Sequence, residues 1–452
     1  MKTAAILSCV GALGMFALGA HAGVFTLADA LATTYETNPQ LAAARAGLRA
    51  SDEDVARARA GLRPKITVEG YYGLSETEKT SATTTTHPLS GTVALTQDIF
   101  RGGQTFAEIE RAKSLDRAER GRLIGTEQSV LLDAVTAYMD VVRDTGRMKI
   151  SRTNVDVLRQ TYENVKKMFA VGMVTKTDLQ QAEARFAQAK LGLYSAQAAL
   201  DSSLAAFERL IGRPAETLET SPSVPKIPAS LDAALREADA RHPEVLIAKN
   251  EERAADQAVN DAIGAMLPHF SVSGQYRYTR DYQSIGSYQF SQPQNQFIVL
   301  GQVTMPIYQG GGEQAAVRQA KNLLAKAKYS TTDTRKRVQQ GVRSSWSAYQ
   351  AAIDSIEASQ AQAHANEQAV EGVRLEQKGG ERSVLDVLNA QQELLSAQTA
   401  ALNAEHDRII AAYRVLAATG GLTASTLKLA VKPYDPMRYY NDNASKWIGL
   451  GE

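Results

Sequence analysis

The chain has 452 residues, of which 44% are hydrophobic and 22% charged, and its formal net charge is +1 at pH 7. This balanced charge gives no basic footprint for a nucleic acid partner. The single cysteine, Cys9, lies in the N-terminal segment described next, so no cysteine downstream is available for disulfides, thiol chemistry or metal binding.

Residues 1–22 have the features of an export signal. Lys2 makes the start basic, residues 4–18 are apolar, and Ala20-His21-Ala22 fits an A-x-A cleavage site. The apolar run is short for a spanning helix, and Cys9 comes too early in it to be a lipidation site. Because no later segment reaches the ~20 apolar residues of a spanning helix, the exported chain is predicted to be periplasmic, secreted or a β-barrel of an outer membrane.

The rest of the chain is internally duplicated. Asn38-Pro39 returns as His242-Pro243, and Gly102-Gly103 returns as Gly310-Gly311. This spacing of about two hundred residues is far longer than a solenoid repeat, so the chain is predicted to contain two large equivalent units. The predicted parts are a first repeat at 23–213, a proline-rich linker at 214–230, a second repeat at 231–421 and a C-terminal tail at 422–452.

Each repeat contains a predicted β-hairpin, at 65–99 and at 269–305. Apolar and polar residues alternate there in stretches of about ten residues, the length that crosses a bilayer in a barrel, and polar loops are expected at 75–90 and 279–296. A half-buried soluble sheet would alternate as well, but the same pair before a long helix in both repeats favours the membrane. The predicted lipid-facing residues are Ile66, Val68, Phe270 and Val272, and the predicted lumen-facing residues are Lys65, Glu69, Ser271 and Gln275.

Each β-hairpin is followed by a predicted helical hairpin, at 104–211 and at 313–419. Both stretches lack proline and are rich in good helix formers, with breaks at Gly172 and at Gly379-Gly380. A helix of ~65 residues is about 100 Å long. Apolar and small residues spaced three and four apart from Leu179 to Leu210 indicate a coiled-coil seam, which a soluble rod would also show.

The helical turns carry acidic residues that fit two roles. Thr175-x-x-Asp178 and Ser383-x-x-Asp386 both match a capping box, and Gly172 and Gly380 are placed to end the preceding helices. If the turns line a pore, Asp386 from several copies would instead form an acidic ring. Both roles are compatible, because a capping carboxylate can still face a central axis.

These motifs together resemble the outer-membrane efflux proteins of the TolC type, over essentially the whole mature chain. The resemblance rests on the motifs DIFRGG and PIYQGG between strand and helix, and on VGMVTKTD and GGERSVLDVLNAQQEL at the helical turns. The resemblance implies an α+β membrane protein that forms a homotrimer in the outer membrane. Each chain would contribute four strands to a twelve-stranded β-barrel and long coiled-coil helices to an α-helical tunnel in the periplasm, with a belt built from 214–230 and part of 421–452.

The resemblance also implies partners and a gate. The trimer would be a passive duct without a cofactor, docked onto a periplasmic adaptor and an inner-membrane ABC or proton-driven transporter. Arg382 matches an arginine that closes the tip by bonding the neighbouring hairpin, where Thr177 and Asp178 match two of its partners. A tyrosine partner is replaced by Gln377, and a second acid is replaced by Asn389, which would weaken cation binding.

Little in the sequence supports catalysis or metal binding. The six histidines are scattered without ligand spacing. The glycines at 310–312 lack a G-x-G-x-x-G pattern or a Walker lysine, so Gly310 and Gly311, like Gly102 and Gly103, are interpreted as a joint between barrel and tunnel. A soluble periplasmic coiled-coil adaptor and an exported enzyme are the alternatives. The exported substrate is open, with protein secretion slightly favoured over small-molecule efflux because no lipidation cysteine is present.

Overall fold

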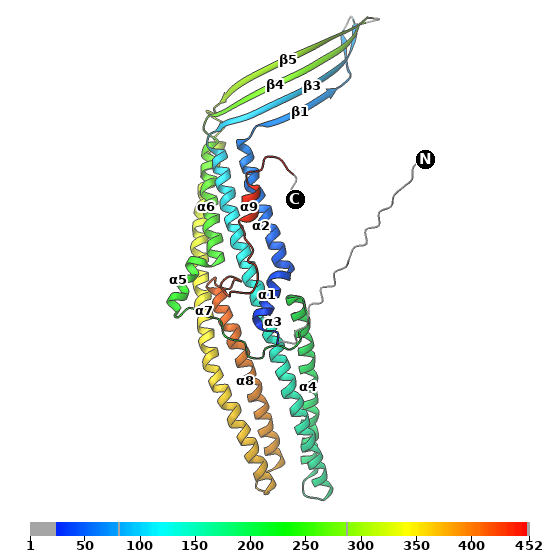
Figure 1. The fold of residues 1–452 in the computed structure, drawn as a ribbon, viewed down its shortest axis with the longest axis vertical. Coiled ribbons are helices and arrows are strands. Elements are labelled where there is room, and N and C mark those ends of the chain that lie inside the picture. The colour runs from blue at the N-terminus through cyan, green and yellow to red at the C-terminus, as the bar shows by residue number, and fades with distance from the viewer. Residues whose placement is uncertain (1–23, 80–81, 286–287, 450–452) are drawn as a thin grey trace, which may run out of the picture.

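The computed structural model describes residues 24–79, 82–285 and 288–449, so the predicted export signal lies outside the described residues. The molecule is elongated, with a β-sheet at one end and long helices leading away from it (Figure 1). The order of elements repeats in the two halves. The first half contains α1 (Leu27–Thr37), α2 (Pro39–Arg59), η1 (Ala60–Leu62), β1 (Lys65–Tyr72), β2 (Ser75–Lys79), β3 (Ala82–Arg101), α3 (Gln104–Ala170) and α4 (Lys176–Ile211). The second contains α5 (Leu231–Arg241), α6 (Pro243–Gly264), β4 (His269–Ile285), β5 (Tyr288–Thr304), α7 (Gly312–Lys378) and α8 (Val384–Ala418), and α9 (Arg438–Asn443) follows.

The X-Pro pairs that mark the duplication separate the two short helices of each half. Asn38 caps α2 by accepting a hydrogen bond from the backbone N–H of Gln40 at 2.9 Å, and proline takes the first helical position. His242 caps α6 in the same way, through Nδ1 and the N–H of Glu244 at 3.3 Å. Proline suits this position because its missing N–H would have no partner in the first turn.

The long helices have the predicted lengths and seam. Helices α3 and α7 contain 67 residues each, about 100 Å at 1.5 Å per residue. Along α4 the buried positions include Ala182, Ala189, Ala196 and Ser203, each seven residues after the previous one. Small side chains at this spacing allow the close helix packing of a coiled coil. Among the helices of the described residues, none is both long and apolar enough to cross a membrane.

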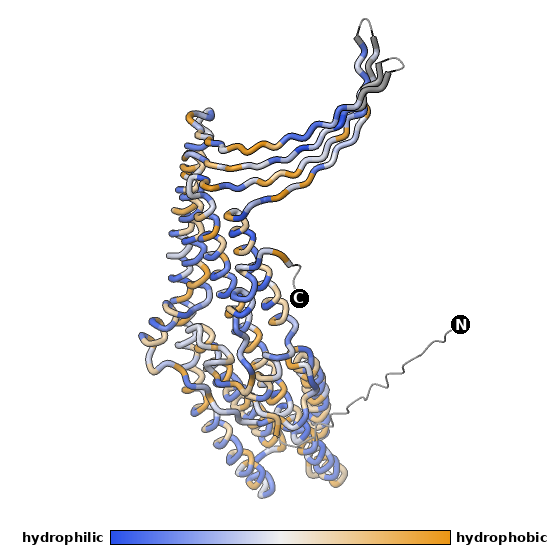
Figure 2. The backbone as a smooth tube through the Cα atoms, turned by 45° about the horizontal axis from the view of Figure 1, so that its top comes forward, coloured by the Kyte–Doolittle hydropathy of each residue, from blue (hydrophilic) through white to orange (hydrophobic). Residues whose placement is uncertain are grey.

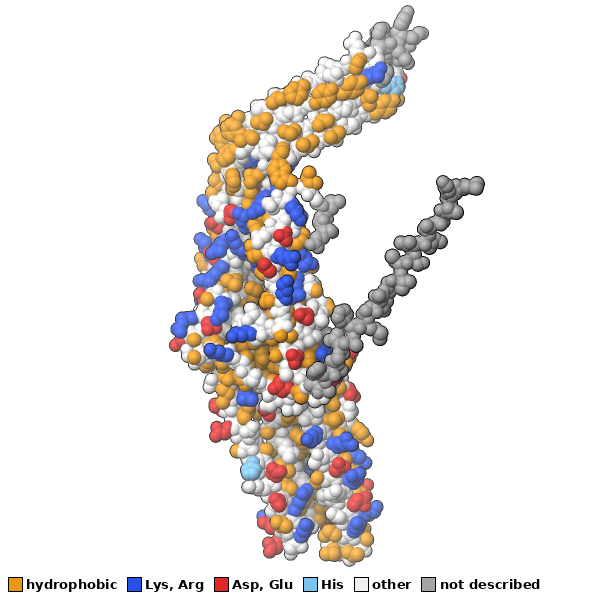
Figure 3. Space-filling model, in the orientation of Figure 1, with side chains coloured by type: hydrophobic (Ala, Val, Ile, Leu, Met, Phe, Trp, Pro, Cys, Tyr) orange, Lys and Arg blue, Asp and Glu red, His pale blue; other side chains and the backbone are white. Residues whose placement is uncertain are grey.

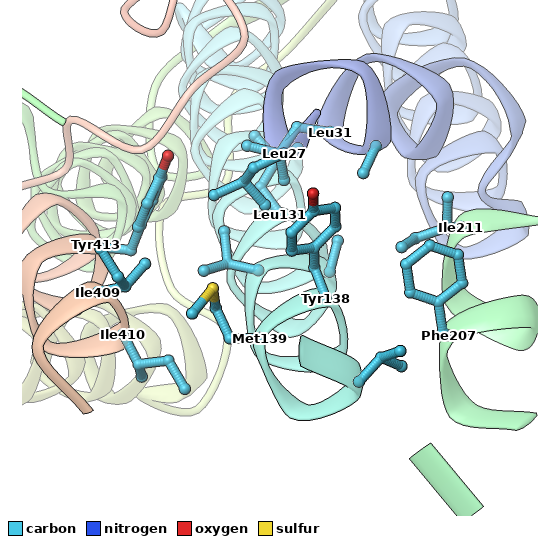
Figure 4. Close-up of a cluster of buried hydrophobic side chains, with 14 of the residues drawn as sticks. Leu27, Leu31, Leu131, Tyr138, Met139, Phe207, Ile211, Ile409, Ile410 and Tyr413 are labelled. Atoms are coloured by element: carbon cyan, nitrogen blue, oxygen red, sulfur yellow. The ribbon is translucent and has the colours of Figure 1, made fainter. Parts of the chain in front are cut away.

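The largest hydrophobic core lies midway along the molecule, where both repeats meet (Figure 4). Tyr138 of α3 and Phe207 of α4 are fully buried there, with Ile409 of α8 beside them. The hydroxyl of Tyr138 donates to the carbonyl of Phe25 at 2.7 Å and accepts from the N–H of Glu219 at 2.8 Å. The linker after α4 therefore packs onto the core instead of extending freely into solvent.

One antiparallel sheet contains all the strands, in the order β1-β3-β4-β5, with β2 also paired to β3. The register aligns residues of one kind in rows across the sheet, and hydrophilic and hydrophobic residues alternate along the strands (Figure 2). One row contains Val68, Val93, Tyr276 and Phe297, and the next row, on the opposite face, contains Glu69, Thr92, Arg277 and Gln296. The sheet thus has one apolar face and one polar face.

One detail of the strand prediction is wrong. The segments 75–90 and 279–296 are not mainly loops, because β3 has 20 residues and β4 and β5 have 17 each. Their antiparallel ladders continue where the apolar alternation stops, since backbone hydrogen bonds need no apolar side chains. A register shift between Asp98 and Phe100 makes Ile99 an extra residue, so Phe100 rather than Ile99 is aligned with Phe270.

The C-terminal tail leaves the core and returns toward the sheet. Leu427 and Leu429 still pack against the core, but α9 lies beside α2, and the last described residues lie just below the sheet (Figure 1). The hydroxyl of Tyr439 in α9 donates to Glu53 of α2 at 2.9 Å. Only the first part of the tail therefore matches the predicted position in a central belt.

A buried charge cluster lies under α9. Asp52 of α2 and Asp116 of α3 are each 2% exposed, and both pair with Arg120, whose guanidinium carbon is 5.3 Å from the ring centre of Tyr440. Burial, reinforced by the hydrogen bond and the charge of Asp116, raises the pKa of Asp52 to about 7 despite Arg120. Because Asp52 and Asp116 are buried beside the single cation Arg120, the two carboxylates favour sharing one proton.

We expect this cluster to make the folded protein less stable as pH rises from about 4 to about 7. In that window the folded state keeps a proton on Asp52 that the unfolded chain releases, and each unit of pKa shift is worth about 1.4 kcal/mol. Asp52→Asn should flatten the fall of the thermal unfolding temperature between about pH 4 and about pH 7. Asp54→Asn is the control, because Asp54 lies on the same helix with an exposed side chain. An equal pH dependence in Asp52→Asn and the unmodified protein would contradict the expectation.

Candidate functional site

The two helical turns lie together at the end of the molecule opposite the sheet (Figure 1). Gly172 has φ 77° and Gly380 has φ 81°, which are left-handed values that favour glycine. Gly379 has φ −76° and needs no glycine for its backbone. Gln377 takes part in the second turn through its backbone carbonyl, which accepts from the N–H of Gly380 at 3.1 Å.

Asp178 and Asp386 are both capping residues. In the first turn the N–H of Asp178 donates to the Thr175 hydroxyl at 3.2 Å, and the N–H of Thr175 donates to the Asp178 carboxylate at 2.9 Å. Ser383 and Asp386 make the same pair of bonds at 3.2 and 2.9 Å. The hydroxyl and N–H of Ser383 hold the pKa of Asp386 below its usual range, so this exposed carboxylate is charged at neutral pH.

Within one chain, Arg382 bonds a residue other than the predicted partners. Its Nε donates to the Glu376 carboxylate of its own hairpin at 3.0 Å. No bond from Arg382 to Thr177 or Asp178 forms among the described residues of this chain, and Thr177 is exposed. A bond to the hairpin of a neighbouring chain stays a prediction.

The two hairpins touch each other near the turns, which the sequence did not reveal. A guanidinium nitrogen of Arg185 on α4 donates to the side-chain oxygen of Asn389 on α8 at 3.3 Å. Beside this bond, Val384 and Leu388 of α8 pack against the apolar seam of the first hairpin. Asn389, singled out only as a replaced acid, therefore contributes to the contact between hairpins.

A second polar link joins the repeats closer to the core. His406 of α8 has Nε2 at 2.9 Å from Asp140 of α3 and Nδ1 at 2.8 Å from Asp407, and Arg143 pairs with Asp140 at 2.8 Å. Burial alone would raise the pKa of Asp140, but the hydrogen bond from His406 and the charge of Arg143 lower it. Sequence spacing could not show this cluster, because its members come from different repeats.

The glycines between strand and helix form tight turns at the sheet end. Gly102, Gly103, Gly310 and Gly311 all have positive φ, and Gly103 and Gly311 immediately precede α3 and α7. At Gly102 a Cβ atom would lie 2.1 Å from the backbone oxygen of Gly264, so no larger residue fits. At this position the joint is fixed by close packing.

The fold and these sites define the class of the protein. Hydrophobic side chains cover the visible face of the sheet, while charged residues of both signs are spread over the helices (Figure 3). A sheet with an apolar face, continued by helices about 100 Å long with charged turns, is the architecture of an outer-membrane channel that extends into the periplasm. The chain belongs to the outer membrane efflux protein family, whose model matches residues 30–213 and 234–421.

Individual relatives agree with this assignment. The chain is 34% identical to the outer membrane efflux protein BepC of Brucella suis, over 94% of this chain and 92% of that protein. It is 26% identical to the alkaline protease secretion protein AprF of Pseudomonas aeruginosa, over 92% of this chain and 87% of that protein. The crystal structure of the Campylobacter jejuni CmeC outer membrane channel superposes with a TM-score of 0.78 at 18% identity, over 93% of this chain and 89% of that chain.

Family membership answers the broad questions left by the sequence. The protein is a channel component of the Gram-negative outer membrane with its helical tunnel in the periplasm, and it is not an enzyme. The alternatives of a soluble adaptor and an exported enzyme are thereby excluded. The number of chains, the export system and the substrate are addressed next.

Proposed function

We propose that three copies of the chain form one twelve-stranded barrel and one helical tunnel, the exit duct of a tripartite export system. The observation that supports this most is the open sheet, whose outer strands β1 and β5 each have one unpaired edge. In lipid every unpaired backbone group costs several kcal/mol. Single-chain barrels start at eight strands, so pairing β5 of one copy with β1 of the next closes the barrel.

The same geometry suggests how export is organised. Because the turns lie at the end opposite the sheet, a barrel in the membrane places them deep in the periplasm, where a periplasmic adaptor and an inner-membrane transporter would dock. The chain would be a passive duct, with energy supplied by the transporter. Among its relatives one is named for efflux and another for protease secretion. We favour protein secretion as the cargo class, and accumulation of an exported protein inside a deletion strain would test this.

Assembly gives the direct test of the duct. The full-length protein, extracted from outer membranes in mild detergent, is expected to be a trimer that separates into monomers on heating and to form conducting pores in planar bilayers. Native mass measurement before and after heating gives the number of chains. A stable monomer that is already inserted in the membrane would show that the open edges are satisfied without partner copies.

A further inference from the structure

The end of the C-terminal tail is fixed against the base of the sheet. Arg63, two residues before β1, donates to the carbonyl of Lys446 at 2.7 Å and to that of Ser445 at 3.2 Å. One turn of chain earlier, Arg59 donates to the carbonyl of Ala444 at 2.9 Å. Two arginines thus hold the backbone of the tail at one height along the molecule.

This fixed segment exposes two large apolar side chains. Trp447 is 69% exposed and Ile448 is 95% exposed. The guanidinium carbon of Arg63 lies 5.0 Å from the ring centre of Trp447, so a cation covers part of one face of the indole. Exposure of these apolar side chains to water is unfavourable in free energy, because the hydrophobic effect favours their burial. We therefore expect an apolar partner outside the chain to cover Trp447 and Ile448.

The surroundings of Trp447 continue the apolar face of the sheet. Leu62, three residues before β1, and Phe106, in the first turn of α3, are 47% and 62% exposed and line a shallow groove with Trp447. At the base of β5 in the other repeat, Ile307 and Tyr308 are 90% and 78% exposed. Apolar and aromatic side chains thus gather at the level where the strands meet the helices.

Positive charge accompanies this apolar level. Arg63 and Lys446 lie close together, since Arg63 donates to the backbone carbonyl of Lys446. Among the described residues, no carboxylate forms an ion pair with either of these two. Apolar rings flanked by unneutralised Lys and Arg fit the boundary between lipid chains and anionic phosphate groups.

We propose that the C-terminal segment 444–449 is a membrane-surface anchor, in which Trp447 and Ile448 insert into the periplasmic leaflet of the outer membrane while Lys446 and Arg63 contact phospholipid phosphates. A bilayer is the partner that matches both features, because the segment lies just below the sheet (Figure 1) and its Lys446 makes no ion pair among the described residues. The anchor fixes how deeply the barrel sits, since the tail is bound to α2 and cannot move independently of the tunnel.

The two tryptophans of the chain allow a matched experiment. Trp346→Phe leaves Trp447 as the only tryptophan, and Trp447→Phe leaves Trp346, which packs near α5. Trp346 follows Gly312 by 34 residues of helix, so it lies about 50 Å from the sheet end. Each full-length variant is reconstituted into liposomes of phosphatidylcholine and phosphatidylglycerol, with or without bromine on the acyl chains near the headgroup. If Trp346→Phe does not assemble, Trp346→Tyr takes its place.

Bromine is expected to quench Trp447 several times more strongly than Trp346, and Lys446→Glu is expected to reduce that quenching in liposomes that contain phosphatidylglycerol. Equal quenching of the two tryptophans would show that Trp447 does not insert into the membrane and would overturn the anchor. The emission maximum of Trp447 would then show whether its indole is exposed to solvent or covered by a neighbouring subunit. If Lys446→Glu leaves the quenching of Trp447 unchanged, the role of Lys446 in binding phosphate is overturned.

Discussion

Val68→Arg is expected to prevent stable insertion of the barrel, whereas Thr67→Arg in the neighbouring position is expected to be tolerated. Val68 belongs to the apolar row that continues through Val93, while Thr67 is aligned with Ala94 on the opposite face. Near the middle of the bilayer an arginine on the lipid side costs about 2–4 kcal/mol per chain. The two positions lie at nearly equal depth, so the difference between them measures orientation alone.

The measurement is the amount of heat-dissociable oligomer in outer membranes and its unfolding by denaturant. Val93→Arg and Thr92→Arg repeat the comparison in a central strand, where the register pairs them with Val68 and Glu69. If both members of each pair reduce assembly equally, the apolar face does not meet lipid.

Local sequence signals predicted most of the helical architecture. The proline-free stretches, the seven-residue spacing of Ala182, Ala189 and Ala196, and the two capping boxes act over short distances along the chain. Each of these patterns predicts the element in which it lies, because helix caps and coiled-coil seams depend on residues only three to seven positions apart. The apolar alternation likewise predicted the membrane part of each strand.

Contacts between distant parts of the chain could not be predicted in the same way. The extra strand length at 75–90 and 279–296 has no apolar alternation to reveal it, and the bulge at Ile99 depends on pairing with β4. Arg59 and Ala444 are 385 residues apart, and Arg185 and Asn389 are 204 apart. No periodicity connects such pairs, so the path of the tail and the contact between hairpins needed the folded structure.

The charge and the capping role of Asp386 can be separated at the tip. Asp386→Asn removes the charge while keeping a side-chain oxygen that can accept the cap hydrogen bonds, and it is expected to lower the cation selectivity of the pore. Ser383→Ala removes the cap hydroxyl and keeps the charge, so it should leave selectivity unchanged and cost about 0.5–2 kcal/mol of stability. Reversal potentials in planar bilayers measure the first effect. A loss of selectivity in Ser383→Ala but not in Asp386→Asn would locate the selective charge elsewhere.

We propose that the bonds of Arg382 help to keep the tip closed, so Arg382→Ser is expected to raise single-channel conductance. Arg382 is an exposed cation with a side-chain exposure of 53%, so each bond is worth about 0.3–1 kcal/mol. Three copies acting together would shift the opening equilibrium by about 1–3 kcal/mol, a factor of about 5–150. Conductance histograms of the assembled channel in planar bilayers give this ratio directly.

Glu376→Gln decides which bond of Arg382 closes the tip. This substitution removes the ion pair at 3.0 Å within the hairpin and leaves Arg382 free to reach Thr177 and Asp178 of a neighbouring chain. If the gate is the bond between chains, Glu376→Gln keeps the pore closed while Arg382→Ser opens it. If both substitutions open the pore equally, the pair within one hairpin holds the tip. Arg185→Ala should add to either opening, since it breaks the separate link to Asn389 between the two hairpins.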